Sequence, residues 1–321
     1  MGETAVPAAP EASPAAGEGI SAAHVRRTFG NVVAVDDMGL TAPAGQVTAL
    51  VGPNGSGKTT LLLVLATLLV PDAGEIRVAG HDPVREPREV RSRIGWMPDA
   101  FGTYDTLTPR EVLQFVAAAY RLPRDRHAAR ARELLALVHL EDLADRPVHV
   151  LSRGQKQRLG LARALVHDPG VLLLDEPAAG LDPRSRIELR GILRDLAADG
   201  RALLVSSHVL AELEEIADRA VFVDGGRTVD EHDLTELRPT QRRPWRLRSL
   251  DQESLLSRLD GLGVTVTGQP GPAGVDVMLA GDEEAADLVA ALVRDGVRVV
   301  ECAPAAGTLE AAYLEMTEGR R

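Results

Sequence analysis

Gly52–Thr60 reads GPNGSGKTT, and this stretch decides the fold of the chain. A glycine, four further residues and then Gly-Lys-Thr form the pattern of a phosphate-binding loop, which needs a strand before it and a helix after it. The preceding Val47–Val51 is β-branched and largely apolar, as a buried parallel strand is, and Leu61–Leu65 can pack a helix against that sheet. The structural context that the motif requires is therefore present.

Each residue type in this loop suits a bound phosphate. Gly52, Gly55 and Gly57 permit positive φ and a close backbone approach, so that N–H groups and the helix N-terminus converge on phosphate oxygens. Lys58 would place a charge at the β- and γ-phosphates, and Thr59 a hydroxyl on Mg²⁺. The chain has 36 lysines and arginines, nearly all of them arginine, so a lysine here indicates a need for a compact ammonium group. The alternative is a Gly-rich turn that happens to precede a helix.

Length and composition narrow the classes of protein. The 321 residues fit one large and one smaller domain, and the net charge of −11 argues against general nucleic-acid binding. Cys302 is the only cysteine, so no internal disulfide can form and we expect a reducing cytosol. Residues 1–18 are rich in Ala, Pro and Glu and are expected to form a disordered tail, not a signal peptide. The longest apolar run, Leu61–Val70, is about half the length that spans a bilayer, so a partner would have to do the spanning.

Two further apolar runs end in chemically active residues. Val171–Leu174 is followed by Asp175 and Glu176, and a buried strand presents such residues at the edge where a doubly wound sheet binds its ligand. With a phosphate-binding loop upstream, Asp175 suits a carboxylate that holds Mg²⁺ and Glu176 one that orients attacking water, the alternative being a helix-capping pair. Residues 201–205 repeat the design and lead through two serines to His208. A Ser/His nucleophile is disfavoured because no elbow motif surrounds it, and a histidine that senses the γ-phosphate is preferred.

Two further sequence patterns predict a β-hairpin and the N-terminus of a helix. His24–Phe29 and Asn31–Val35 look like two strands joined at Gly30. Phe29 at the tip could stack on a nucleotide base, although a lone aromatic is more often part of the core. Farther along, Ser152 is a plausible N-cap of a helix whose first turn, at Gly154-Gln155, would offer free N–H groups.

In the order of these motifs, the chain resembles the ATP-binding subunit of an ABC transporter over residues 20 to about 235. It looks most like the single-cassette exporter type, which pairs with a separately encoded multi-spanning permease. The resemblance implies an α/β fold over 19–236, a P-loop NTPase with a RecA-like mixed sheet core, an antiparallel β region and a helical subdomain at about 106–168. It also implies that the subunit binds ATP with Mg²⁺ and hydrolyses the ATP. The residues implied in ATP binding are Phe29, Val35, Gly52, Pro53, Asn54, Gly55, Ser56, Gly57, Lys58, Thr59 and Thr60.

The resemblance also assigns roles in catalysis, metal binding and dimer formation. It implies a head-to-tail homodimer, bound peripherally at the cytoplasmic side of the membrane, in which the signature motif of one subunit closes over ATP on the other. Nucleic acid is not expected as a partner. The alternative is a soluble ABC ATPase acting on ribosomes or DNA, but such relatives usually carry two cassettes or a long coiled coil. The assigned residues are Glu176, His208 and Lys58 for catalysis, Leu151, Ser152, Arg153, Gly154 and Gln155 for the signature, Asp182 for the D-loop, and Thr59, Asp99 and Asp175 for the metal.

Two positions depart from the family pattern. Arg153 stands where glycine is typical, so that backbone position is not expected to need positive φ. Asp99 stands where the family places a glutamine after the proline. A carboxylate is a harder Mg²⁺ ligand than an amide, so Asp99 is expected to make the site more dependent on Mg²⁺, unless it only caps the turn that follows.

After a linker at 237–244, residues 245–321 read as a smaller α+β domain. Strands and helices alternate as β-α-β-β-α-β, which predicts a ferredoxin-like fold with a closing helix near Tyr313. Its expected role is regulation or dimer contact, and the alternative is a passive extension.

Overall fold

The computed structural model describes residues 18–99, 102, 105–209, 213, 216–234, 243–271 and 274–304. The predicted N-terminal tail, most of the predicted linker and the predicted closing helix lie outside these residues. Contacts divide the chain into two units. The first contains the chain to His208 together with Val221–Glu231, and the second contains Val209–Ala220 and the chain from His232.

This division differs from the predicted single domain over 19–236. Two local contacts account for the difference. The backbone N–H of Leu234 donates to the carbonyl of Asp218 over 2.8 Å, and Arg219 pairs with Asp233 at 3.0 Å. These bonds group Val209–Ala220 with the chain that follows β9, although β8 itself remains in the large sheet.

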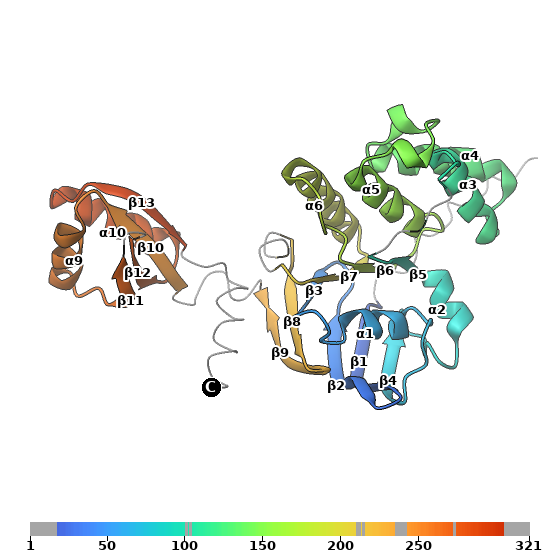
Figure 1. Ribbon diagram of the computed structural model, residues 1–321, viewed down its shortest axis with the longest axis horizontal. Coiled ribbons are helices and arrows are strands. Elements are labelled where there is room, and N and C mark those ends of the chain that lie inside the picture. The colour runs from blue at the N-terminus through green and yellow to red at the C-terminus, as the bar shows by residue number, and fades with distance from the viewer. Residues whose placement is uncertain are drawn as a thin grey trace, which may run out of the picture. The chain divides into compact units, whose positions relative to one another are not determined.

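The described part of the first unit is built on a nine-stranded sheet in the order β4-β1-β2-β9-β8-β3-β7-β6-β5 (Figure 1). In β3, β6 and β7 every residue is buried, as expected of parallel strands covered on both faces. Helices α1 and α6 lie on opposite faces of these parallel strands (Figure 1). The strands are β1 (Ile20–Phe29), β2 (Val32–Ala42), β3 (Val47–Val51), β4 (Ala73–Val78), β5 (Ile94–Met97), β6 (Val171–Asp175), β7 (Ala202–Ser207), β8 (Arg219–Asp224) and β9 (Arg227–Asp233).

Side-chain N-caps begin α3, α5 and α6. Thr108 caps α3 through a capping box with Glu111, and Asp182 caps α6 by accepting from the N–H of Ser185. Among the described residues no helix is long and apolar enough to cross a membrane. The helices are α1 (Lys58–Leu65), α2 (Pro87–Arg93), α3 (Pro109–Ala119), α4 (Arg124–Leu137), α5 (Arg153–Ala164) and α6 (Pro183–Ala198), with short 3₁₀ turns at Glu141–Leu143 and Val148–Val150.

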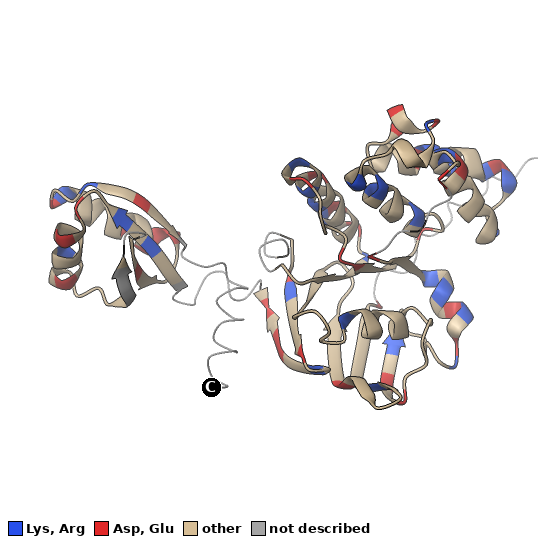
Figure 2. Ribbon diagram, viewed as in Figure 1, with Lys and Arg blue, Asp and Glu red and all other residues tan. Residues whose placement is uncertain are grey.

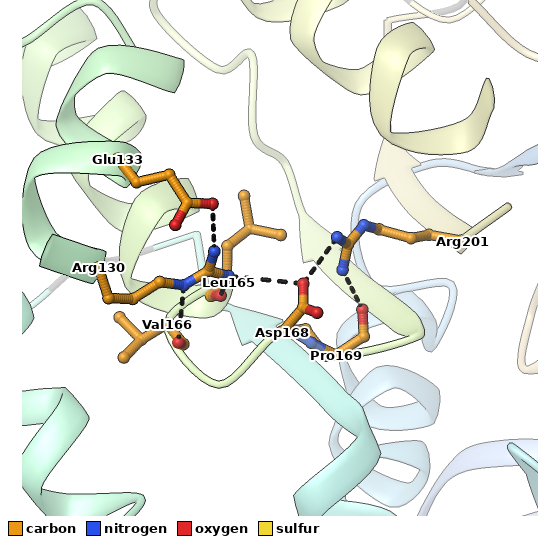
Figure 3. A network of polar contacts seen from close by, with 7 residues as sticks. All are labelled: Arg130, Glu133, Leu165, Val166, Asp168, Pro169 and Arg201. Atoms are coloured by element: carbon orange, nitrogen blue, oxygen red, sulfur yellow. Dashed lines mark hydrogen bonds and ion pairs between the residues drawn. The ribbon is translucent and has the colours of Figure 1, made fainter. Parts of the chain in front are cut away.

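A polar network joins the helical subdomain to the sheet (Figure 3). Arg130 on α4 donates to the carbonyls of Leu165 and Val166, just after α5, at 2.7 and 3.1 Å. Asp168, in the connection to β6, pairs with Arg130 at 3.5 Å and with Arg201, just before β7, at 2.8 Å. One carboxylate therefore connects two arginines that come from different layers of the fold.

The second unit has its own sheet and core. Its elements follow one another as β-α-β-β-α-β, the order expected from the sequence, and its antiparallel sheet has the order β11-β12-β10-β13. Trp245, Leu247 and Val277 are buried with residues of both helices. The elements are β10 (Arg243–Ser249), α9 (Gln252–Gly261), β11 (Val266–Gly271), β12 (Gly274–Leu279), α10 (Asp282–Arg294) and β13 (Val299–Pro304).

Candidate active site

The phosphate-binding loop follows β3 and ends at the first residue of α1. Gly52 admits no side chain, because a Cβ there would lie 2.2 Å from the carbonyl oxygen of Val223. Gly57 has φ of 99° and caps α1 without a side-chain hydrogen bond, so the first N–H groups of α1 stay open to an anion. Pro53, Asn54 and Gly55 are exposed, so the outer side of the loop is accessible to a ligand.

Lys58 is buried and folds back over the loop. Its Nζ donates to the carbonyls of Gly52 and Pro53 at 2.7 and 3.1 Å. Burial lowers the pKa of Lys58, while the carboxylates of Glu176 and Asp175 act to raise it. The ammonium group therefore lies on the loop, in the electrostatic field of the two acids at the carboxyl end of β6.

The parallel sheet brings three chain segments to one edge. Val51 of β3 pairs with Ser207 of β7, and Asp175 of β6 pairs with Ser206. Because the carboxyl ends of parallel strands meet at the same edge, the loop after β3, the acids after β6 and the serines of β7 converge there. Strand register therefore joins motifs that lie more than 100 residues apart.

At this edge Asp175 is buried and has a partner for each oxygen. Thr59 Oγ1 donates to Oδ2 at 2.9 Å, and Ser206 Oγ donates to Oδ1 at 2.6 Å. Ser206 Oγ also accepts from the N–H of Glu176 at 3.0 Å. Sequence reasoning treated Ser206 only as part of a disfavoured nucleophile pair and missed this role. The signal available was its position on the strand next to the one that ends in Asp175.

Glu176, the residue after Asp175, has a strained backbone conformation. Its φ is 50°, in the left-handed region that a residue with a Cβ seldom adopts. His208 Nδ1 lies 2.9 Å from Glu176 Oε2. Burial raises the pKa of Glu176, and the hydrogen bond from His208 and the charges of His208 and Lys58 partly oppose the rise. A half-buried carboxylate with a raised pKa suits a general base.

The structure places Phe29 on the surface and Val35 in the core. Phe29 is 44% exposed at the end of β1, so it is not the core aromatic of the alternative interpretation. Val35 was expected to contact ATP, but its side chain is completely buried in the core cluster, so it has no accessible surface for a ligand. Contact between Val35 and ATP therefore stays a prediction, and it would have to be made without the side chain. The pairing of β1 with β2 shifts register between Val35 and Val33, an irregularity that was not visible in the sequence.

The signature residues lie at the start of α5 and contact the D-loop of the same chain. Ser152 caps α5 as expected, but its Oγ accepts from the Gln155 N–H at 3.3 Å, so that N–H is not free as predicted. Arg153 has no positive φ, which confirms the expectation. Its guanidinium lies against Gly180 of the D-loop, where a Cβ would come within 2.6 Å of it, and a Cβ on Gly154 would lie 2.9 Å from Ser185 Oγ.

Asp99 is exposed two residues after β5. Among the described residues no three His, Cys, Asp or Glu side chains form a ready group for a metal ion. The structure therefore brings Thr59 and Asp175 together and gives no contact that adds Asp99 to them.

This arrangement of loop, buried acid and half-buried glutamate defines a P-loop nucleoside triphosphatase. Comparison with known proteins gives the family. Residues 35–179 match the family described as ABC transporter. The chain is 42% identical over 212 residues, 66% of this chain and 67% of the relative, to the daunorubicin resistance ATP-binding protein DrrA3 of Streptomyces coeruleorubidus.

A second relative extends through the second unit. Over 298 residues, 91% of this chain and 90% of the relative, the chain is 34% identical to the daunorubicin/doxorubicin resistance ATP-binding protein DrrA of Streptomyces peucetius. The solved dimeric structure of the ATP-binding cassette MJ0796, in a post-hydrolysis state with ADP and Pi, is also similar, with a TM-score of 0.61 and 26% identity over 67% of this chain and 98% of that one. The chain therefore belongs to the ABC transporter family, as an ATP-binding and ATP-hydrolysing subunit.

Proposed function

We propose that this subunit drives export through a separately encoded membrane permease, bound at the cytoplasmic side of the membrane. Support comes from the names of similar proteins, which include daunorubicin resistance proteins and a Nod factor export ATP-binding protein of Burkholderia lata. The site on this subunit binds a nucleotide. The permease, and not this subunit, therefore selects the exported molecule.

One observation carries the assignment of the chemistry: Lys58, Asp175 and Glu176 lie at one edge of the sheet, where the charges of the two carboxylates act to raise the pKa of Lys58. Lys58 binds the phosphates of ATP, and Glu176 accepts a proton from the attacking water. His208 donates to Glu176 in the structure, which supports a role beside the transferred phosphate. Phe29, exposed at the end of β1, stacks on the base.

The oxygen donors of Thr59 and Asp175 fit Mg²⁺. The hydroxyl and the carboxylate lie 2.9 Å apart, and hard oxygen ligands are what Mg²⁺ prefers. When bound, Mg²⁺ neutralises charge on the β- and γ-phosphates. Thr59 and Asp175 would hold it, with Asp99 as the further candidate.

The head-to-tail dimer is part of the proposal. The solved structures of the similar ATP-binding cassette MJ0796 are dimeric. In this chain Ser152 stands at the N-terminus of α5, and Arg153 and Gly154 lie against the D-loop. Because of these contacts, the signature motif and Asp182 would move as one unit when a second subunit closes over ATP.

The experiment compares Glu176→Gln, Lys58→Ala and a control, Glu89→Gln, whose side chain is 57% exposed on α2. We expect Glu176→Gln to bind ATP and to hydrolyse it at least ~10²-fold more slowly, because loss of a general base removes catalysis and not binding. Lys58→Ala should lose binding, and Glu89→Gln should change neither property. Normal turnover in Glu176→Gln would contradict the assignment.

Transport and the ribosome or DNA alternative are separated by fractionation. We expect recovery with membranes only when the cognate permease is co-expressed. Basic and acidic residues both occur on α3, α4 and α6, whereas α5 carries basic residues only (Figure 2). The net charge of −11 argues against general nucleic-acid binding and favours the transport role. Co-sedimentation with ribosomes in the absence of a permease would contradict it.

A further inference from the structure

Arg27 lies over the ring of Phe29. The guanidinium carbon is 4.9 Å from the ring centroid. The two residues are two positions apart on β1, so their side chains lie on the same face of the strand. A guanidinium in this position is attracted by the π-face of the ring and covers that face.

Asp72 holds Arg27 in this position. Asp72 Oδ1 accepts from Arg27 Nη1 at 2.9 Å, and Oδ2 accepts from the N–H and the hydroxyl of Thr28 at 2.7 and 2.6 Å. The N–H of Asp72 also donates to the carbonyl of Arg26 at 2.7 Å. The bond from the Thr28 hydroxyl is the main cause that lowers the pKa of Asp72, so the carboxylate is charged at neutral pH.

The same hairpin passes beside the phosphate-binding loop. Phe29 pairs with Val32 across the hairpin. Two residues farther along β2, the carbonyl oxygen of Ala34 comes so close to Gly57 that a Cβ there would lie 2.4 Å from it. Ala34 lies at the register shift between the Arg27–Val35 and Thr28–Val33 pairs, and two residues of chain span at most about 7 Å, so the Phe29 pair is within about that distance of this contact along β2. A nucleotide with its phosphates on the loop can therefore reach Phe29 with its base.

We propose that Arg27 is a positioning residue for the purine base of the bound nucleoside triphosphate. It covers one face of Phe29 and, because Asp72 and Thr28 fix it, keeps the other face turned toward the base. This inference rests on the proposed stacking role of Phe29. It adds that the arginine acts through the ring and makes no contact with the phosphates.

The test measures binding of two probes to the full chain: ATP, and inorganic tripolyphosphate, which has the phosphates without the base. We expect Arg27→Ala to weaken ATP binding about threefold to fivefold and to leave tripolyphosphate binding unchanged. The effect should appear in KM and not in kcat. The matched control is Arg26→Ala, which removes an arginine from the adjacent position, where its Nε lies 3.8 Å from Asp36 Oδ1. It should bind both probes as the wild type does.

Two further variants keep the test decisive. Arg27→Lys retains the charge without the planar group and should recover part of the affinity. In a Phe29→Ala background, Arg27→Ala should have no additional effect, because the ring through which it acts is absent. An equal loss for ATP and tripolyphosphate, or a full effect of Arg27→Ala without Phe29, would overturn the proposal. If Phe29→Ala alone leaves ATP binding unchanged, the stacking role of Phe29 itself is wrong.

Discussion

Ser206 Oγ donates a 2.6 Å hydrogen bond to Asp175 and accepts a 3.0 Å bond from the backbone N–H of Glu176. One hydroxyl on β7 thus fixes the carboxylate of Asp175, the last residue of β6, and the backbone of the next residue. Both groups are buried or half-buried, so neither can turn to bulk water if the hydroxyl is removed.

Ser206→Ala should therefore lower both activity and stability. We expect kcat to fall about tenfold, or ~1.4 kcal/mol in the barrier, because Asp175 loses one of its two fixed partners. The free energy of unfolding should fall by about 1–3 kcal/mol because a buried acceptor and a donor lose their partner. Ser206→Thr keeps the hydroxyl and should recover most of both. Steady-state kinetics and urea denaturation test this, and equal loss in the two variants would argue against the hydrogen bond as the cause.

The raised pKa of Glu176 predicts that Glu176→Gln stabilises the fold at neutral pH. Because burial raises the folded-state pKa above the unfolded value, the ionised carboxylate destabilises the folded state at pH above both values. This destabilisation fades as the pH falls through the window between the folded and unfolded pKa. The melting temperature of Glu176→Gln should exceed that of the wild type at pH 7, and the difference should shrink toward acid pH. A constant difference, or none at pH 7, would contradict the prediction.

Arg130 should contribute to the stability of the first unit. Arg130→Ala removes donors to two carbonyls after α5 and the contact with Asp168, so we expect a loss of about 2 kcal/mol. Arg132→Ala, at an exposed position on the same helix, is the control and should cost under ~0.5 kcal/mol. Fluorescence of Trp96 in a Trp245→Phe background reports on the first unit alone, because the chain has two tryptophans. Equal losses in the two arginine variants would rule out the network as the cause.

Asp99 remains a candidate metal ligand, and a Mg²⁺ titration tests it. Asp99→Gln should retain ATPase activity and lower the apparent Mg²⁺ affinity by at most roughly tenfold, or ~1.4 kcal/mol, because an amide carbonyl is a weaker ligand than a carboxylate. Superimposable titration curves of wild type and variant would instead support the capping role.

The elements that local sequence determines were predictable. GPNGSGKTT specifies its loop because only glycine fits at Gly52 and at the positive φ of Gly57. The apolar runs Val47–Val51 and Val171–Leu174 specify buried strands because both faces must be covered, and they form β3 and β6, with Asp175 as the last residue of β6. The β-α-β-β-α-β order of the second unit was also predictable, because apolar residues recur with one period in strands and another in helices.

Only the tertiary structure decided which side chains meet. Ser206 reaches Asp175 because β6 and β7 pair in one particular register, and a shift by one residue would turn Ser206 to the other face. The packing of β1 and β2 in the whole sheet likewise buries Val35 and leaves Phe29 exposed under Arg27. Sequence periodicity determines which residues share a face of one strand, but strand order and register arise from the packing of the whole sheet. These contacts, from Thr59 and Ser206 to Asp175 and from His208 to Glu176, connect segments that are 31 or more residues apart and exist only once that packing is complete.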